Sequence, residues 1–262
     1  MAIDKTIPIP LYFQLAEHLR EQIELGQLNP GDQLPSEREL GEQSGISRMT
    51  ARQAIMYLVR QGRLLVRPGI GTFVAEPKLT HDTLHLLGFT EEMLRSGQAP
   101  TSQVLEQLSV MPPQRVAADL NLQPGQAAVK IVRLRLSQDT PLLLETVFVP
   151  ARLAPGLDSE DLSQASLYAL LEQKFGLALD HAQQTLEVTT ASEDEALLFG
   201  VLPGTSMLLL EGVTYTADEQ PVEAFKALYL GKKFKFALES QRLNWGAGAG
   251  QPRLSVVLRG GH

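Results

Sequence analysis

Five arginines lie in a stretch of the chain that contains no acidic residue. From Gln43 to Ala75 there is no Asp or Glu, and arginines occur at positions 48, 52, 60, 63 and 67. A polyanion would meet only positive or neutral side chains of this stretch. A guanidinium can bridge two acceptors on a guanine edge or bind a phosphate, whereas Ser and Thr hydroxyls usually contact the DNA backbone. These residue types indicate binding to DNA.

Capping residues predict the helices that would carry these arginines. Ser36 followed by Glu39 is typical of a helix start, and Gly45 permits a sharp turn. Ser47 can cap a second helix. This second helix has a narrow apolar face at helical spacing, formed by Ala51, Ala54, Ile55 and Leu58. Two helices joined by a short turn, the second with a basic outer face, are typical of a helix-turn-helix.

A glycine-containing hairpin is expected after the second helix. The segment 63–74 alternates apolar residues around a turn at Pro68 and Gly69, which predicts a two-stranded wing. The alternative interpretation is that the arginines only make the surface of a helix soluble. The capped turn, the basic face and the ribbon occur in this order along the chain, which favours DNA binding. The candidate DNA-binding residues are Ser36, Arg38, Ser47, Arg48, Thr50, Arg52, Gln53, Arg67, Gly69 and Gly71.

Three motifs in the first 75 residues resemble a known family. PLYFQLAEHLREQI, LPSERELGEQSGISRMTARQAI and GIGTFV are similar, in this order, to the winged-helix domain of the GntR family of bacterial transcription regulators. The resemblance implies a regulator that binds double-stranded operator DNA. A homodimer is expected, because two-fold symmetry presents two recognition helices to the half-sites of a palindrome.

Composition and charge agree with a cytoplasmic DNA-binding protein. The chain of 262 residues has a net charge of −7. Residues 1–75 contain eight Lys/Arg and eight Asp/Glu, so the remaining 15 basic and 22 acidic residues place the whole acidic excess after residue 75. The absence of cysteine excludes disulfides and thiolate metal sites. No secretory signal or membrane-spanning run is found, so a soluble protein without a membrane partner is expected.

The rest of the chain predicts an α+β domain. Two hairpins, 127–137 with 141–149 and 206–216 with 221–230, alternate with helices and indicate an antiparallel sheet. Before them, a helix is expected from about residue 84 to Gly97, with a break at Gly88. The expected organisation is a winged helix-turn-helix domain (1–75), a linker (76–83), a second domain (84–245) and a flexible tail (246–262).

Paired arginines mark a candidate anion site in this second domain. Arg133 and Arg135 are two residues apart on a predicted strand and therefore point to the same face. Two guanidiniums on one face suit a phosphate or a carboxylate. The alternative is a structural ion pair of these arginines with Glu145. Ser166 can likewise be only a helix cap, and Tyr168 and Tyr229 only core aromatics.

The second domain resembles the UTRA effector-sensing domain of the HutC-type branch of the GntR family. The similarity rests on FTEEM, the Arg133–Arg135 strand, TPLLLETVFVP, SLYALLEQKFG and QPVEAFKALYLG. It implies the antiparallel-sheet fold of chorismate lyase. The effector pocket it implies is lined by Phe89, Thr90, Arg133, Arg135, Glu145, Ser166, Tyr168, Glu223 and Tyr229.

The resemblance also implies the chemistry of the effector. Arg133, Arg135, Ser166 and Tyr168 would hold the phosphate, and Glu145 and Glu223 would hold the sugar, of a phosphorylated sugar or amino sugar. A carboxylate metabolite, such as a product of histidine breakdown, is the alternative. The segment YLGKKFKF departs from the Tyr-Arg-Gly-Asp-Arg run common in the family, with Leu230 and Lys232 in place of an arginine and an aspartate.

An enzyme is disfavoured by the residues that catalysis would need. The kinship to chorismate lyase suggests a lyase-like alternative, but the five histidines form no triad-like pattern and no G-x-S-x-G elbow occurs. His81 and His85 have metal-ligand spacing, yet no third ligand is dictated, and solvated linker residues are the preferred interpretation. No catalytic residue, metal or cofactor is expected.

Overall fold

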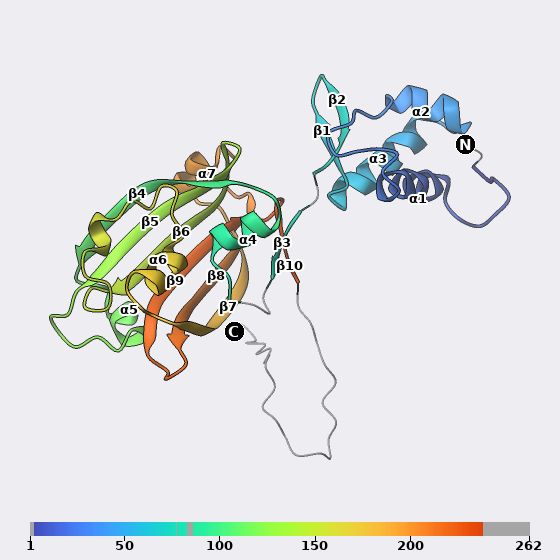
Figure 1. Ribbon diagram of the computed structural model, residues 1–262. Coiled ribbons are helices and arrows are strands. Elements are labelled where there is room, and N and C mark those ends of the chain that lie inside the picture. Colours follow the sequence, from blue (N-terminus) through green and yellow to red (C-terminus); the bar gives the residue numbers. More distant parts are fainter. Residues whose placement is uncertain (1–2, 77, 83–85, 238–262) are drawn as a thin grey trace, which may run out of the picture. The chain divides into compact units, whose positions relative to one another are not determined.

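The computed structural model describes residues 3–76, 78–82 and 86–237, which belong to two compact units, Met1–Lys78 and Leu79–His262 (Figure 1). His85 and the expected tail, 246–262, lie outside the described residues. None of the helices in the described ranges is long and apolar enough to span a bilayer.

The first unit is a winged helix-turn-helix, as the sequence predicts. Its elements are α1 (Leu11–Glu24), α2 (Glu37–Ser44), α3 (Arg48–Arg60), β1 (Leu64–Arg67) and β2 (Gly71–Val74). The Ser36 hydroxyl accepts a hydrogen bond from the Glu39 N–H, and the Glu39 carboxylate accepts one from the Ser36 N–H. Gly45 ends α2 with φ of 64°, and Ser47 caps α3. Local capping chemistry therefore determines both ends of the turn.

The core of this unit lies between the three helices and the wing. The apolar face of α3 is fully buried, with Ala51, Ala54 and Leu58 at 0% exposure. It packs against Leu15 of α1 and Leu40 of α2, among others. Burial of one face of α3 leaves its polar residues at the surface.

The second unit is built on a six-stranded antiparallel sheet in the order β4-β5-β6-β9-β8-β7. The sheet strands are β4 (Pro100–Val110), β5 (Ala128–Ser137), β6 (Thr140–Pro150), β7 (Leu179–Thr190), β8 (Ser206–Thr216) and β9 (Pro221–Leu230). The helices are α4 (Phe89–Arg95), α5 (Gln114–Asp119), η1 (Leu157–Ser159), α6 (Leu167–Gln173) and α7 (Glu193–Phe199). Both predicted hairpins are present, β5–β6 and β8–β9.

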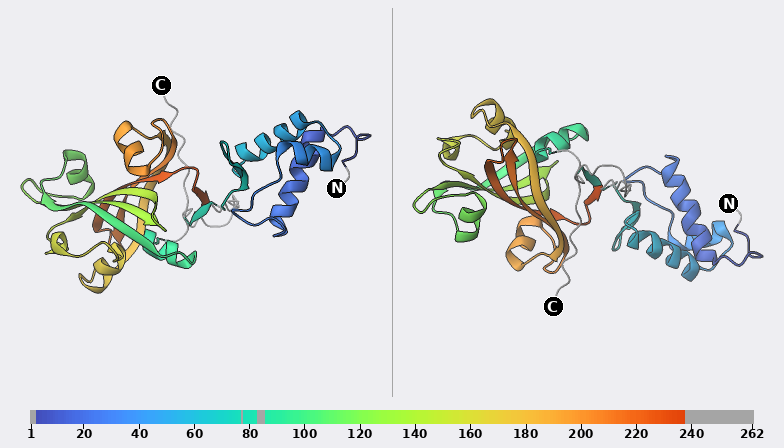
Figure 2. Two further views of the ribbon diagram at one scale, coloured as in Figure 1. Left: turned by 90° about the horizontal axis from the view of Figure 1, so that it is seen from above. Right: turned by 90° about the horizontal axis from the view of Figure 1, so that it is seen from below.

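Helices cover both faces of this sheet (Figure 2). On one face, α6 packs against Ile131 and Val147, and α4 packs against Leu143. On the other face, α7 packs against Leu134, while α5 packs near Ala224. Because side chains alternate along a strand, Leu134 faces away from the arginines on either side of it.

The start of the second unit differs from the expectation at two places. The helix expected from about residue 84 to Gly97, with a break at Gly88, is present only after that break, as α4 from Phe89; residues 86–88 are not helical, and 84–85 lie outside the described residues. Residues 79–82, expected within a linker, form strand β3 (Leu79–Asp82), which pairs in parallel with β10 (Phe234–Ala237). Both strands are four residues long and are paired across about 150 residues of sequence, so no local pattern reveals them.

Candidate functional site

The exposed face of α3 carries the predicted DNA-contacting side chains. Arg48 and Arg52 have side chains that are 70% and 59% exposed, and Gln53 is exposed as well. Thr50 is partly buried, and its hydroxyl lies 2.8 Å from that of Ser47. Arg48, Arg52 and Gln53 can therefore reach a groove, whereas the two hydroxyls already bind to each other at the start of the helix.

The stretch Gln43–Ala75 contains no acidic side chain, but a carboxylate from outside it lies beside its arginines. Glu37 of α2 lies across the turn, with its carboxylate 3.1 Å from Arg48 Nε and 3.9 Å from Arg52 Nε. Arg38 is paired with Glu42 one helical turn later, at 3.3 Å. The acid-free stretch begins after these glutamates in sequence, but the helix-turn-helix brings Glu37 back beside the arginines. Such exposed pairs are weak and exchange readily for a phosphate.

The wing is supported by a third short segment. Gly69 has φ of 74°, and Arg67 lies over the Phe73 ring, with 4.8 Å between the guanidinium carbon and the ring centroid. The Gln33 side chain donates a hydrogen bond to the Ile70 carbonyl at 3.1 Å. Gly71 has φ of 154°, a backbone conformation that other residues rarely adopt, and a Cβ there would also displace the end of the Gln33 side chain. Gln33 was not predicted as a contact of the wing.

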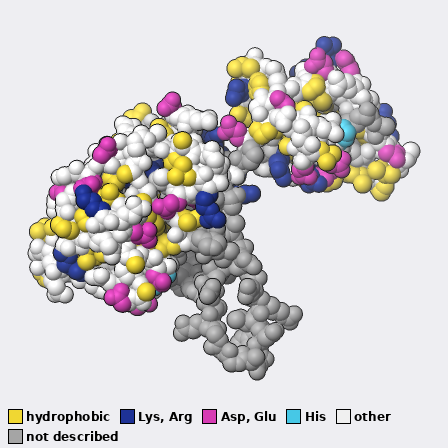
Figure 3. All heavy atoms as spheres, viewed as in Figure 1, with side chains coloured by type: hydrophobic (Ala, Val, Ile, Leu, Met, Phe, Trp, Pro, Cys, Tyr) yellow, Lys and Arg dark blue, Asp and Glu magenta, His cyan; other side chains and the backbone are white. Residues whose placement is uncertain are grey.

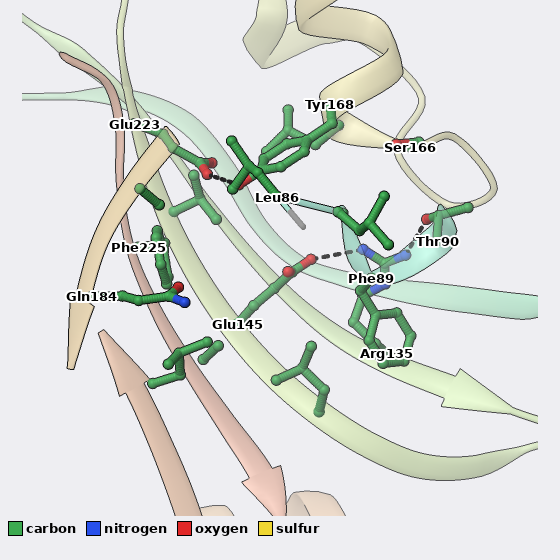
Figure 4. Close-up of a pocket in the computed structure, with 18 of the residues that line it drawn as sticks. Leu86, Phe89, Thr90, Arg135, Glu145, Ser166, Tyr168, Gln184, Glu223 and Phe225 are labelled. Atoms are coloured by element: carbon green, nitrogen blue, oxygen red, sulfur yellow. Dashed lines mark hydrogen bonds and ion pairs between the residues drawn. The ribbon is translucent and has the colours of Figure 1, made fainter. Parts of the chain in front are cut away.

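In the second unit, all nine predicted effector residues line one cavity of about 530 Å³. Strands β5, β6, β7, β8 and β9 contribute side chains to it, and the beginnings of α4 and α6 lie over it (Figure 4). Leu86, Gln184 and Phe225 line the same cavity and were not predicted. In Figure 4 the side chains of Glu145, Arg135, Tyr168 and Glu223 point towards its interior.

Strand register places the two arginines against one carboxylate. Arg133 and Glu145 are direct cross-strand partners on β5 and β6. Glu145 Oε1 lies 2.6 Å from Arg133 Nη2 and 2.8 Å from Arg135 Nη1. Both arginines are only 2% exposed. The structural ion pair considered from the sequence is present, but it is buried in a cavity wall and not on an exposed sheet face.

This cluster stays charged despite its burial. Burial alone would raise the pKa of Glu145, but the positive charges of Arg133 and Arg135 outweigh it and hold that pKa below its ordinary value. Burial lowers the pKa of Arg133, and Glu145 opposes that shift. Within the described residues, neither Nε of the two arginines has a hydrogen-bond partner. Two guanidiniums therefore share one ionised carboxylate, and each keeps an N–H donor without an acceptor in the described part of the chain.

A second carboxylate lies in a different environment. Glu223 Oε1 accepts hydrogen bonds from the Tyr168 hydroxyl at 2.7 Å and from the Thr214 hydroxyl at 2.8 Å. Burial raises the pKa of Glu223 to about 7, although both hydrogen bonds favour the ionised form. Burial and the neighbouring Glu223 raise the pKa of Tyr168 well above its ordinary value, so the phenol stays a donor. Thr214, the cross-strand partner of Glu223, was not predicted as part of the site.

The helix starts over the cavity contribute polar groups of their own. Thr90 Oγ1 accepts a hydrogen bond from Arg135 Nη2 at 2.6 Å, and the Arg135 guanidinium lies 4.8 Å from the centroid of the Phe89 ring. Ser166 caps α6, as its alternative interpretation proposed, and its hydroxyl also donates to Glu91 Oε1 at 2.7 Å. Glu91 was not predicted to contact the site, because the residues around it in the sequence indicate only the start of a helix.

Tyr229 is both a core aromatic and a cavity-lining residue. Its ring is 4% exposed and makes edge contacts with Phe234 and Phe236. Among the described residues, no group of three or more His, Asp or Glu side chains has the geometry of a metal site. Side chains of both charges are interspersed over the visible face of the second unit in Figure 3.

Comparison with known proteins assigns both units to families. Residues 11–74 match the model described as bacterial regulatory proteins, gntR family, and residues 95–235 match that of the UTRA domain. The chain is 37% identical over 244 residues to the HTH-type transcriptional repressor NagR of Bacillus subtilis, which covers 93% of this chain and 100% of the relative. It is 29% identical to the mannosyl-D-glycerate transport/metabolism system repressor MngR of Escherichia coli, over 89% of this chain and 97% of the relative.

A solved structure supports the same assignment. The crystal structure of PhnF from Mycobacterium smegmatis has a TM-score of 0.62 and 28% sequence identity, and the match covers 87% of this chain and 100% of that one. NagR and MngR are named as repressors and not as enzymes, in agreement with the sequence-based prediction. With a gntR helix-turn-helix followed by a UTRA domain, the chain belongs to the HutC-type branch of the GntR family of DNA-binding transcriptional regulators.

Proposed function

We propose that this protein is a repressor that binds operator DNA as a homodimer and releases it when a phosphorylated sugar or amino sugar fills the cavity of the second unit. The observation that carries the proposal is the pair of buried arginines, Arg133 and Arg135, in the wall of this cavity. Buried cations are costly unless they are paired or bind a ligand, and here one carboxylate serves two of them.

The donors of the two arginines favour an anionic group with several oxygens. Glu145 neutralises one of the two guanidiniums, and each arginine keeps an Nε–H without an acceptor among the described residues. A phosphate has several oxygens that can accept hydrogen bonds from these N–H groups. The same oxygens can accept hydrogen bonds from the hydroxyls of Ser166 and Tyr168. Those hydroxyls now donate to Glu91 and Glu223, so the phosphate would replace carboxylate oxygens that already occupy these donors.

The remainder of the cavity suits a polyhydroxy ligand. Glu145 and Glu223 can accept hydrogen bonds from sugar hydroxyls or from an amine, and Gln184 extends into the same space. The relative MngR is named as the repressor of a transport and metabolism system for mannosyl-D-glycerate, a sugar derivative that carries a carboxylate. A carboxylate is therefore the second candidate ligand, since paired arginines can bind either a phosphate or a carboxylate.

On the DNA side, α3 is the recognition helix of the proposal. Arg48, Arg52 and Gln53 would contact base edges and phosphates in the major groove, and Arg67 with the glycines of the wing would contact the adjacent backbone. Ser36, Arg38, Ser47 and Thr50 would support these contacts near the backbone. A homodimer places two such helices on the half-sites of a palindrome.

Isothermal titration calorimetry on the intact protein tests the ligand class. We expect glucosamine 6-phosphate or N-acetylglucosamine 6-phosphate to bind, and glucosamine without phosphate to bind at least tenfold more weakly. Arg135→Ala should remove the binding. Lys130→Ala is the matched control, because Lys130 lies on the same strand, points to the opposite face and pairs with Glu106. Binding of glucuronate with no response to any sugar phosphate would replace the phosphate proposal by the carboxylate alternative.

A further inference from the structure

A parallel two-stranded ribbon joins the two ends of the second unit. Strand β3 pairs with β10 over four residues, from Leu79 with Phe234 to Asp82 with Ala237. The Leu79 N–H donates a hydrogen bond to the Lys233 carbonyl at 2.7 Å, immediately before β10 begins. The strands lie side by side in Figure 1 and in both views of Figure 2, where β3 is teal and β10 is red.

The ribbon lies very close in sequence to the DNA-binding unit. The last backbone hydrogen bond of the wing joins the Ala75 N–H to the Arg63 carbonyl at 2.9 Å. Only residues 76–78 separate this bond from Leu79, the first residue of β3. A connection of this length spans at most about 14 Å even when fully extended. Any displacement of β3 therefore moves the point at which the winged helix is attached.

The other strand of the ribbon packs directly behind the cavity wall. Phe234 is 2% exposed, and its ring lies edge-on to that of Tyr229, with centroids 4.9 Å apart and an interplanar angle of 71°. Phe236 contacts the same ring, at 5.4 Å and 84°. Tyr229 lines the cavity, so one aromatic ring separates the ligand space from β10.

The same core cluster also includes the second strand and the anion end of the cavity. Leu79 of β3 packs against it, and Phe89, whose ring lies beneath the Arg135 guanidinium, belongs to it. One core cluster therefore includes Phe89, Tyr229 and Phe234, with Arg135 against one side of it and Leu79 against another. Close-packed side chains have few alternative arrangements, so a shift at one end is transmitted as a displacement and is not absorbed locally.

We propose that the β3–β10 ribbon transmits occupancy of the cavity to the winged helix, and that Phe234 and Phe236 are the positioning residues of this response. A ligand that engages Arg135 and Tyr229 would shift β10 through the two phenylalanines. β3 would follow, because the two strands are hydrogen-bonded as one unit. This inference rests on the proposed function for its ligand, but the ribbon and its packing against Tyr229 do not depend on which ligand binds.

The first test separates coupling from binding. In Phe236→Leu and Phe234→Leu we would measure the operator Kd without ligand, the Kd for glucosamine 6-phosphate without DNA, and the ratio of operator Kd values with and without saturating ligand. We expect both separate affinities to stay within about threefold of wild type, and the ratio to fall at least fivefold towards one. Coupling is a free energy between sites, so it can be lost while each affinity remains.

Phe199→Leu is the matched control, because Phe199 is an equally buried phenylalanine in the α7 cluster on the opposite face of the sheet. It should leave the ratio at the wild-type value. A wild-type ratio in both ribbon variants, with ligand and operator still bound, would overturn the proposal.

The second test needs no ligand. Tyr229→Leu removes the ring against which both phenylalanines pack, and we expect the amides of Leu79–Asp82 to exchange hydrogen at least fivefold faster than in wild type. Phe199→Leu should leave their exchange unchanged. Unchanged exchange in Tyr229→Leu would show that β3 is not mechanically connected to the cavity. If calorimetry shows that no sugar phosphate binds, the proposed function is wrong. The hydrogen-exchange experiment would still test whether the β3–β10 ribbon is connected to the cavity wall.

Discussion

Replacing Glu223 by glutamine tests the electrostatic description of the cavity. Glu223 is buried, and this burial raises its pKa from 4.5 to about 7. At about 1.4 kcal/mol per unit, keeping this carboxylate ionised in the folded protein costs about 3 kcal/mol of folding free energy. Glutamine has nearly the same shape and still accepts hydrogen bonds from Tyr168 and Thr214, but it carries no charge.

The sign of the effect follows from proton binding. Because the folded-state pKa of Glu223 is raised, the folded protein binds more protons than the unfolded chain between pH 4.5 and 7. The contribution of Glu223 to stability is complete below pH 4.5 and is lost as the pH rises through 7. Glu145 acts in the opposite direction, since its pKa is lowered, and it is the same in both proteins, so the difference between them isolates Glu223.

Differential scanning calorimetry at pH 5 and pH 8 measures this difference for the second unit. At pH 8 the Glu223→Gln variant should be more stable by about 3 kcal/mol, or on the order of 6–12 °C in Tm, and at pH 5 the two proteins should unfold at nearly the same temperature. Glu187→Gln, at an exposed position of β7, is the control and should give no such difference. A Glu223→Gln variant with the same Tm as wild type at pH 8 would refute the account of a buried, costly carboxylate.

Three further predictions concern the two binding sites. Arg52→Ala should lose about 1–3 kcal/mol of specific operator binding in an anisotropy titration, and unchanged affinity would reject a base-reading role. Glu37→Gln should free Arg48 and Arg52 from their carboxylate partner and strengthen binding by at most about fivefold at low salt, the size expected of an exposed pair; weaker binding would contradict this. Arg133→Ala should leave operator binding intact and abolish the effector response, and a normal response would remove Arg133 from the site.

Local signals made the first unit predictable. The capping box of Ser36 and Glu39, the left-handed Gly45 and the Ser47 cap each act over three or four residues, so the sequence determines the helix-turn-helix without knowledge of the tertiary fold. The pairing of Glu37 with Arg48 depends on how α2 and α3 pack together. Charge counted along the sequence could not reveal it.

In the second unit, hairpin register explains both the successes and the omissions. The alternation along β5 correctly placed Arg133 and Arg135 on one face, and the adjacent strand brought Glu145 beside them. Thr214 was missed because a register irregularity next to it, in the β8–β9 hairpin, disturbs simple counting from the turn. The roles of the nine cavity residues came from the family resemblance, and they remain predictions until a ligand is measured.

The ribbon was the part of the fold that sequence patterns could not supply. Strands β3 and β10 each contain four residues, too few for a clear periodicity, and their pairing is non-local. The sequence segment that departs from the usual pattern of the family, YLGKKFKF, includes the first three residues of β10 and both phenylalanines that contact Tyr229. The proposed role of Phe234 and Phe236 in the control of DNA binding rests on their contacts with Tyr229 and not on a sequence motif.

The central claim is that occupancy of the cavity controls binding to operator DNA, and fluorescence anisotropy tests it most directly. A labelled duplex from upstream of the protein's own gene would be titrated with the intact protein, with and without glucosamine 6-phosphate and N-acetylglucosamine 6-phosphate. We expect tight, salt-sensitive binding that at least one of the two sugar phosphates weakens by tenfold or more. Tight binding that neither ligand changes, in a protein that calorimetry shows to bind one of them, would contradict the claim.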